Sequence, residues 1–147
     1  MSKQPIILID SYKQGLDYHN CIEKYLKNKS NDNDFNKEII MPLLEQPLFK
    51  DLLNYEYYSE VPYFKIINGI YESKRIDFMA IKKNDIYIID YKTDNQEDER
   101  YFIDNYSLQI LEYKSDLSFL IDKNKLKINK VYCYIYAKKI NKMIQID

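Results

Sequence analysis

The sequence predicts a mixed α/β domain in which a β-sheet is flanked by helices and preceded by a helical segment. Apolar residues recur at helical spacing before residue 56, whereas residues 59–91 hold three β-prone runs. A second long helical pattern and another β-prone run follow. A chain of 147 residues fits one domain, residues 1–147, with a helical segment at 1–56 and an α/β core at 57–147.

Composition narrows the class of protein. Apolar residues make up 46% of the chain and charged residues 31%, the balance of a globular protein. No apolar run is long enough to cross a membrane, so we expect a cytoplasmic protein without a membrane partner. The net charge of −1 shows no basic excess, so a role on DNA would require delivery by another component or a local basic patch.

The few cysteines and glycines exclude two kinds of cofactor site. Cys21 and Cys133 belong to no CxxC pair, so they cannot form a four-cysteine zinc or iron–sulfur site, and we expect reduced thiols. The two glycines form no glycine-rich phosphate loop, which excludes nucleotide-binding folds of that kind.

The N-terminal segment contains two helical patterns separated by a polar stretch. The first, at about 16–27, carries four residues on one face: Leu16, His19, Ile22 and Leu26. The polar stretch 28–36 is predicted to be a loop. Residues 37–54 are predicted to form two short helices or one kinked helix, because Pro42 and Pro47 interrupt the pattern.

The central segment is predicted to be strand-rich. Residues 59–67 alternate as in a strand, with Pro62 near a sheet edge. Residues 75–81 and 86–91 are two further strands, joined by the polar turn 82–85. Together these last two strands predict a β-hairpin.

The C-terminal third is predicted to contain a helix and one or two strands. The acidic stretch 94–99 is expected to be a solvated loop, followed by a helix at about 97–120. Its predicted apolar face consists of Phe102, Tyr106, Ile110, Tyr113, Leu117 and Leu120. Residues 130–137 form a strand with which 143–146 can pair. Three alternating tyrosines of this strand could pack against a helix or stack on single-stranded DNA: Tyr132, Tyr134 and Tyr136.

Two carboxylates and a lysine form the candidate chemical site. The hairpin can bring Asp77 and Asp90 side by side at the ends of apolar strands. Close carboxylates repel each other, which favours a divalent cation such as Mg²⁺ or Mn²⁺ between them. Lys92 lies two positions beyond Asp90, so both face the same side of the strand. Taken alone, Asp-x-Lys could equally be a solvated strand end.

Five motifs resemble one nuclease family. Arg75-Ile76-Asp77 and Asp90-Tyr91-Lys92-Thr93 together resemble the core of the PD-(D/E)xK nucleases, and most closely the nuclease domain at the C-terminus of RecB and AddA helicase–nucleases. Three more motifs match in order along residues 15–120: Gly15-x-x-x-His19-x-x-x-Glu23, Glu60-x-Pro62-Tyr63 and Tyr106-x-x-Gln109-x-x-x-Tyr113. The chain departs from the family pattern at Leu16, where threonine is usual, and in lacking a glycine near Arg75.

The resemblance implies a restriction-endonuclease-like fold and a Mg²⁺-dependent DNA nuclease acting with a helicase in double-strand break repair and recombination. The implied metal ligands are His19, Asp77, Asp90 and the carbonyl of Tyr91. The implied catalytic residues are Asp77, Asp90, Lys92 and Gln109. Supporting roles fall to Glu23, Glu60, Tyr106 and Tyr113.

Several of these residues also have purely structural interpretations. Without the resemblance, His19 would be a packed core histidine, Gln109 a helix-surface amide and Glu60 a surface carboxylate. For the whole chain, the alternatives are a non-catalytic DNA- or protein-docking module on the same fold and a standalone nuclease. An iron–sulfur relative is disfavoured because the cluster cysteines are absent.

Overall fold

The computed structural model describes residues 4–27 and 37–147, with side chains from residue 15 onward; the predicted loop 28–36 lies outside the described residues. Four helices and five strands are described in this part of the chain: α1 (Gln4–Lys27), α2 (Lys37–Leu44), α3 (Pro47–Leu52), β1 (Glu56–Ile67), β2 (Ile70–Lys82), β3 (Asp85–Lys92), α4 (Glu99–Lys123), β4 (Lys130–Ala137) and β5 (Lys142–Gln145). No described helix has the length and apolar character that a membrane crossing requires.

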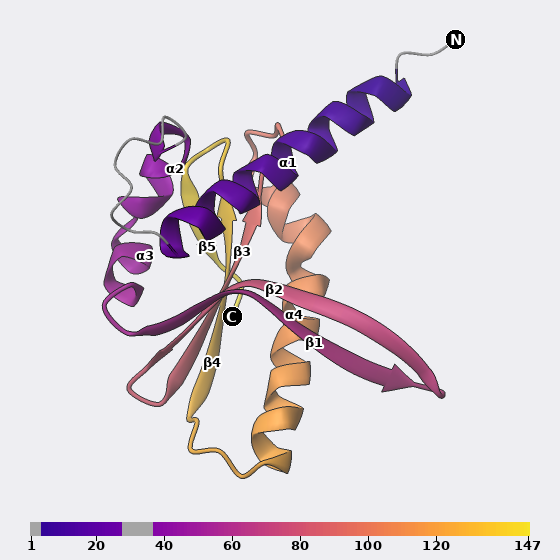
Figure 1. Ribbon diagram of the computed structural model, residues 1–147, viewed down its shortest axis with the longest axis vertical. Coiled ribbons are helices and arrows are strands. Elements are labelled where there is room, and N and C mark those ends of the chain that lie inside the picture. Colours follow the sequence, from indigo (N-terminus) through magenta and orange to yellow (C-terminus); the bar gives the residue numbers. More distant parts are fainter. Residues whose placement is uncertain (1–3, 28–36) are drawn as a thin grey trace.

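The strands form one sheet with the order β1-β2-β3-β4-β5. Neighbouring strands are antiparallel except β3 and β4, which are parallel. The connection between this parallel pair is α4, which packs along one face of the sheet (Figure 1). The predicted mixed α/β sheet flanked by helices is therefore confirmed.

Two apolar cores lie on opposite faces of the sheet. One joins the N-terminal helices to inward-facing strand residues such as Phe78, Ile89 and Tyr91. The other joins α4 to the alternate residues Ile86 and Ile88 of β3. Because β3 is buried on both faces, it can hold a charged side chain in a dry environment.

Both long helices bury a face slightly different from the predicted one. In α1, Leu16 is 46% exposed and Tyr18 is buried in its place. In α4, Leu120 is exposed and Ile121 is buried. The predicted apolar stripes were wrong at Leu16 and Leu120, because a small rotation of a helix decides which side chain meets the sheet.

The two central strands separate at the predicted carboxylates. The ladder between β2 and β3 runs from Lys82 paired with Asp85 to Phe78 paired with Ile89, and it ends there. The next residues on the two strands are Asp77 and Asp90. We call this point of separation the fork.

Beyond the fork, β2 stays paired with β1 and the two form an arm that leaves the sheet (Figure 1). The arm turns at Asn68 and Gly69, which both adopt the positive φ angles of a tight hairpin turn. Strand β2 consequently begins at Ile70, five residues before the predicted start at Arg75. The Asn-Gly dipeptide is the sequence signal for this turn.

Candidate functional site

Asp77 and Asp90 are the two buried charged residues in the described part of the chain, with 8% and 3% of their surface exposed. They occupy the first unpaired positions of the fork, facing each other where β2 and β3 part. Burying a carboxylate is unfavourable unless it is paired or bound to a cation. Each of the two carboxylates therefore needs a hydrogen-bonding or positively charged partner.

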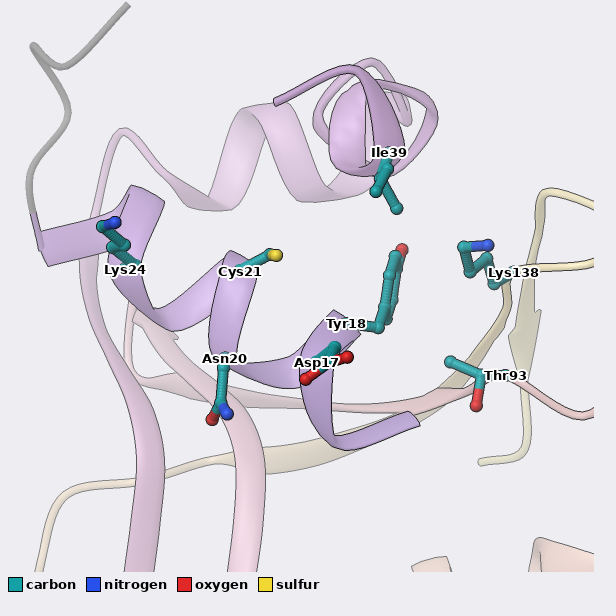
Figure 2. A pocket seen from close by; sticks show the side chains of 8 residues that line it. All are labelled: Asp17, Tyr18, Asn20, Cys21, Lys24, Ile39, Thr93 and Lys138. Atoms are coloured by element: carbon teal, nitrogen blue, oxygen red, sulfur yellow. The ribbon is translucent and has the colours of Figure 1, made fainter. Parts of the chain in front are cut away.

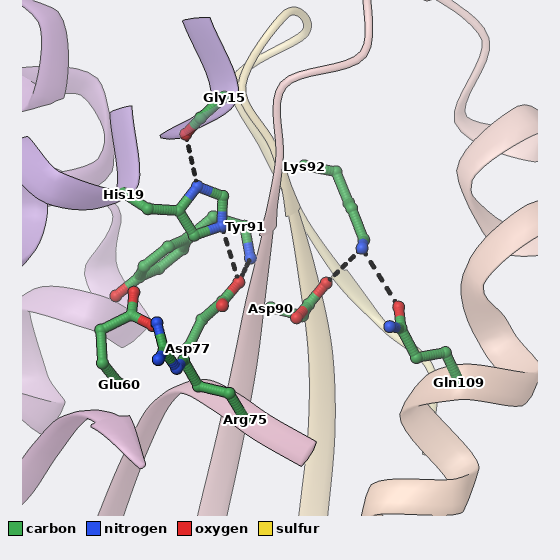
Figure 3. Close-up of polar contacts among 9 residues, drawn as sticks. All are labelled: Gly15, His19, Glu60, Arg75, Asp77, Asp90, Tyr91, Lys92 and Gln109. Atoms are coloured by element: carbon green, nitrogen blue, oxygen red, sulfur yellow. Dashed lines mark hydrogen bonds and ion pairs between the residues drawn. The ribbon is translucent and has the colours of Figure 1, made fainter. Parts of the chain in front are cut away.

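Asp77 has two such partners. Its Oδ2 accepts a hydrogen bond from the backbone N–H of Tyr91 at 2.8 Å and lies 3.0 Å from Nε2 of His19 (Figure 3). Burial pushes the pKa of Asp77 upward, but the hydrogen bond and charge of His19, assisted by the Tyr91 N–H, outweigh it and lower the pKa. Asp77 is thus the ionised member of the pair.

Asp90 is less well satisfied. Burial, followed by the charge of Asp77, raises the pKa of the Asp90 carboxyl. Lys92 Nζ lies 2.9 Å from Asp90 Oδ2 as an ion pair. This contact lowers the pKa of Asp90, but it does not outweigh the effect of burial and of Asp77. The fork therefore contains two buried carboxylates that repel each other, and a divalent cation between them would stabilise both.

His19 is held by both ring nitrogens. Nδ1 donates to the carbonyl of Gly15 at 2.7 Å, one turn earlier in α1, and Nε2 contacts Asp77. Burial lowers the pKa of His19, but the hydrogen bond and charge of Asp77 more than compensate and raise it to about 9. A Cβ on Gly15 would lie 3.1 Å from Thr93 Oγ1, so this glycine lets α1 approach the end of β3 closely.

Lys92 is surrounded by groups from α4. Its Nζ donates to Gln109 Oε1 at 3.1 Å and lies 4.2 Å from the centroid of the Tyr106 ring. The Tyr106 hydroxyl donates to Asp94 Oδ2 at 2.5 Å, and the Tyr101 hydroxyl donates to the same oxygen at 2.8 Å. Three contacts with Asp90, Gln109 and the aromatic face thus fix the ammonium.

Asp94 corrects one prediction. The sequence predicts a solvated acidic loop here, but Asp94 is half-buried and anchors two tyrosines of α4. Asp98 of the same stretch caps α4, accepting from the backbone N–H of Arg100. Residues 95–97 are exposed, as predicted.

Glu60 lies on β1 across from Asp77, between the regular pairs Ser59 with Phe78 and Val61 with Ile76. Its φ of 53° is unusual for a strand residue with a side chain and costs on the order of 1–3 kcal/mol. The Glu60 side chain is largely buried and lies 3.6 Å from the Arg75 guanidinium. Burial and the charge of Asp77 raise its pKa.

These groups line one open pocket of about 420 Å³. Nine of the ten predicted site residues border it: His19, Glu60, Asp77, Asp90, Tyr91, Lys92, Tyr106, Gln109 and Tyr113. The structure does not bring Glu23 to this pocket, since its carboxylate contacts Lys27 one turn away at 2.7 Å. Arg75 and Asp94 also border the pocket but were not predicted as site residues.

The donor set suits a hard divalent cation. It combines two carboxylates, an imidazole and a backbone carbonyl. The Tyr91 N–H donates to Asp77 and so points toward the fork. The Lys92 carbonyl points the other way, toward β4, where it accepts from the Lys138 N–H. Because successive carbonyls of a strand point to opposite sides, the Tyr91 carbonyl also faces the fork. No three described His, Cys, Asp or Glu side chains are already grouped as a complete metal site. His19 would have to exchange its bond with Asp77 for ligation.

The His19–Asp77 pair predicts how stability depends on pH when no metal is bound. The folded-state pKa of His19, about 9, lies above its usual value of 6.5, so the pair stabilises fully below about pH 6.5 and progressively less as pH rises through 9. In EDTA, we expect the stability difference between the unaltered chain and His19→Gln to shrink by about 1–2 kcal/mol from pH 6 to pH 10. Urea unfolding of both proteins at several pH values measures this difference in the free energy of unfolding. A difference that does not change with pH would contradict the His19–Asp77 pair.

Comparison with known proteins finds a similar region in a much longer protein. The chain is 30% identical over 119 residues to an ATP-dependent helicase/nuclease subunit from Clostridium beijerinckii. The match covers 74% of this chain and 9% of that protein, so the chain spans a small part of the relative's length. No family model matches the chain. The similarity relates this chain to a region of a helicase/nuclease subunit.

Proposed function

We propose that this chain is a Mg²⁺-dependent DNA nuclease domain of the PD-(D/E)xK type, with a restriction-endonuclease-like fold. The observation that carries the proposal is the fork, where two buried carboxylates face each other and the Lys92 ammonium lies 2.9 Å from Asp90. Lys92 reaches the same pocket from the strand that supplies Asp90. The similarity to a helicase/nuclease subunit supports the same activity.

Asp77, Asp90, His19 and the carbonyl of Tyr91 would hold the cation. A bound Mg²⁺ polarises a phosphoryl oxygen and makes a nearby water more acidic. Asp77 is suited to this role because its low pKa keeps it ionised. The Gly15 carbonyl holds the His19 ring through Nδ1, leaving Nε2 as the nitrogen that can turn to a cation.

Lys92 supplies positive charge beside the reacting phosphate. Its ammonium can donate hydrogen bonds to the attacking water or to a phosphate oxygen, where negative charge increases in the transition state. Gln109 and the Tyr106 ring hold it near Asp90 and limit its freedom. A preorganised ammonium loses less entropy when the substrate binds.

The near-neutral chain is suited to work with a partner that binds DNA. Its net charge of −1 provides little general attraction for phosphates. Because the relative is named as a helicase/nuclease subunit, we propose that a helicase domain or subunit supplies the DNA during repair and recombination. Isolated, the domain should therefore cleave DNA slowly at physiological salt.

Replacing Asp90 with asparagine separates metal binding from stability. The raised pKa of Asp90 means that its ionised form destabilises the fold, with no penalty below the usual value of 3.8 and a full penalty above the folded-state pKa. In EDTA at pH 8, Asp90→Asn should raise Tm by about 3 °C, equivalent to about 1 kcal/mol. Thermal unfolding measures the shift.

With Mg²⁺, the same variant should lose function. We expect Mg²⁺ to raise Tm of the unaltered chain but not of Asp90→Asn, and cleavage of linear DNA to fall by at least about 100-fold in the variant. Asp122→Asn, at an exposed position on α4, is the matched control and should behave like the unaltered chain. Equal cleavage and equal Mg²⁺ response in both variants would refute the proposed site.

The Asp94–Tyr106 contact predicts a graded effect on catalysis. Tyr106→Phe keeps the ring over Lys92 but loses the bond to Asp94, so we expect kcat to fall about threefold. Tyr106→Leu removes the ring as well and should lower kcat about 10- to 30-fold with KM nearly unchanged. Steady-state cleavage at saturating Mg²⁺ gives both constants.

If Tyr106 acts by positioning Lys92, the reductions in kcat caused by changing the two residues should not add. In the background Lys92→Met, adding Tyr106→Leu should cause no further loss, because the group that Tyr106 positions is already gone. Tyr132→Leu, outside the pocket, serves as the control for general loss of an aromatic side chain. Fully additive losses would show that Tyr106 acts independently of Lys92.

A further inference from the structure

The two strands that part at the fork each carry a carboxylate and a cation two positions apart. On β3, Lys92 follows Asp90, and on β2, Arg75 precedes Asp77. Side chains two positions apart on a strand share a face, so each cation lies on the same side as its carboxylate. All four border the open pocket at the fork, which we call the fork pocket. The proposed chemistry uses three of them and leaves Arg75 without a role.

Arg75 is held more loosely than Lys92. Its side chain is 65% exposed, and its guanidinium lies 3.6 Å from the Glu60 carboxylate. That distance is too long for a hydrogen bond, so the contact is ionic. A guanidinium has five N–H donors in one plane. These donors are therefore available to a ligand that enters the fork pocket.

The two cations flank the carboxylates. Lys92 lies beside Asp90, whereas Arg75 lies beside Glu60 on the far side of Asp77 (Figure 3). They sit on diverging backbones, because beyond the fork β2 follows β1 and β3 follows β4. A DNA strand with one phosphate at the carboxylates and Lys92 would therefore carry a neighbouring phosphate toward Arg75.

Other lysines on this side of the molecule belong to a neighbouring hollow. It has a volume of about 510 Å³ and lies between α1, α2 and the end of β4 (Figure 2). Lys24 and Lys138 line it, but neither borders the fork pocket. The described lining of the fork pocket has Arg75 and Lys92 as its arginine and lysine side chains, together with four carboxylates: Glu60, Asp77, Asp90 and Asp94. A second phosphate in this acidic setting needs a cation, and Arg75 is the one that remains.

We propose that Arg75 binds the phosphate next to the one that is cleaved, so that the fork pocket holds two successive phosphates of one DNA strand; this inference rests on the proposed nuclease function. A guanidinium can donate to both unshared oxygens of a phosphodiester at once. The contact lies away from the reacting atoms, so it aligns the strand and contributes to kcat/KM. Glu60 keeps the guanidinium at the rim of the pocket when no DNA is bound.

A neutral linkage identifies the phosphate that Arg75 contacts. The substrate is an end-labelled oligonucleotide with one methylphosphonate, which lacks a single negative charge, and gel electrophoresis gives the cleavage rate at each bond with Mg²⁺. In the unaltered chain, cleavage at one of the two bonds adjacent to the methylphosphonate should fall about tenfold. Arg75→Gln should cleave the unmodified strand about tenfold more slowly, and the methylphosphonate should then reduce cleavage at that adjacent bond by less than about twofold.

Arg100 provides the matched control. Its side chain is 76% exposed and pairs with one carboxylate, that of Asp104, outside the fork pocket. Arg100→Gln should cleave both strands like the unaltered chain. Arg75→Lys keeps the charge but not the two parallel donors, so it should recover only part of the lost rate. Mg²⁺ should raise Tm of Arg75→Gln as much as Tm of the unaltered chain, which verifies a folded protein with an intact cation site. If Arg75→Gln does not fold, Arg75→Lys provides the same comparison.

Binding measured without cleavage gives an independent readout. In a Lys92→Met background, fluorescence anisotropy gives Kd for the unmodified oligonucleotide at several salt concentrations. Adding Arg75→Gln should lower the slope of log Kd against log salt by about one, because one phosphate contact is lost. Adding Arg100→Gln should leave the slope unchanged.

Failure of this inference can be told apart from failure of the proposed function. Suppose that the unaltered chain cleaves DNA with Mg²⁺, but the methylphosphonate has the same effect with and without Arg75→Gln, or the salt slope does not change. Only the Arg75 phosphate site is then refuted. If the unaltered chain neither cleaves DNA nor gains stability from Mg²⁺, the nuclease proposal fails and the phosphate site fails with it.

Discussion

The separation of β2 from β3 at Asp77 and Asp90 is the structural feature on which the site depends. Continued pairing would extend the β2–β3 ladder through the space where the fork now opens, and the Tyr91 N–H would bond to a backbone carbonyl instead of to Asp77. The fork is possible because β2 keeps its other partner, β1, while β3 keeps β4. Each strand therefore keeps a partner on its other side, with the β1–β2 pairing interrupted at Glu60 and Asp77, and the unpaired edge between β2 and β3 provides polar groups in a buried setting.

Several unfavourable features gather at the same place. Asp90 is buried with a raised pKa, Glu60 has a strained backbone, and the Tyr91 hydroxyl is buried without a hydrogen-bond partner in the described part of the chain. The two apolar cores that sandwich the sheet stabilise the fold against these costs. Local strain and poorly satisfied charge are common where a protein binds a ligand, because the ligand relieves them.

Much of the site follows from local sequence rules. Hairpin register places Asp77 opposite Asp90, and the two-residue strand repeat puts Lys92 beside Asp90. Other features depend on tertiary contacts that no local pattern contains. The burial of Asp94 needs tyrosines that lie 7 and 12 residues further along α4, and the positive φ of Glu60 arises where β1 crosses the fork. The exposed Leu16 shows the same limit, since helix rotation is set by the sheet beneath.

The most direct measurement is anomalous diffraction from crystals soaked in Mn²⁺, which reports where a divalent cation binds. A single strong peak within bonding distance of both Asp77 and Asp90, with His19 turned from Asp77 toward it, is the predicted result. The account would be contradicted if the fork stayed without a peak while the two carboxylates and Lys92 kept the positions described above.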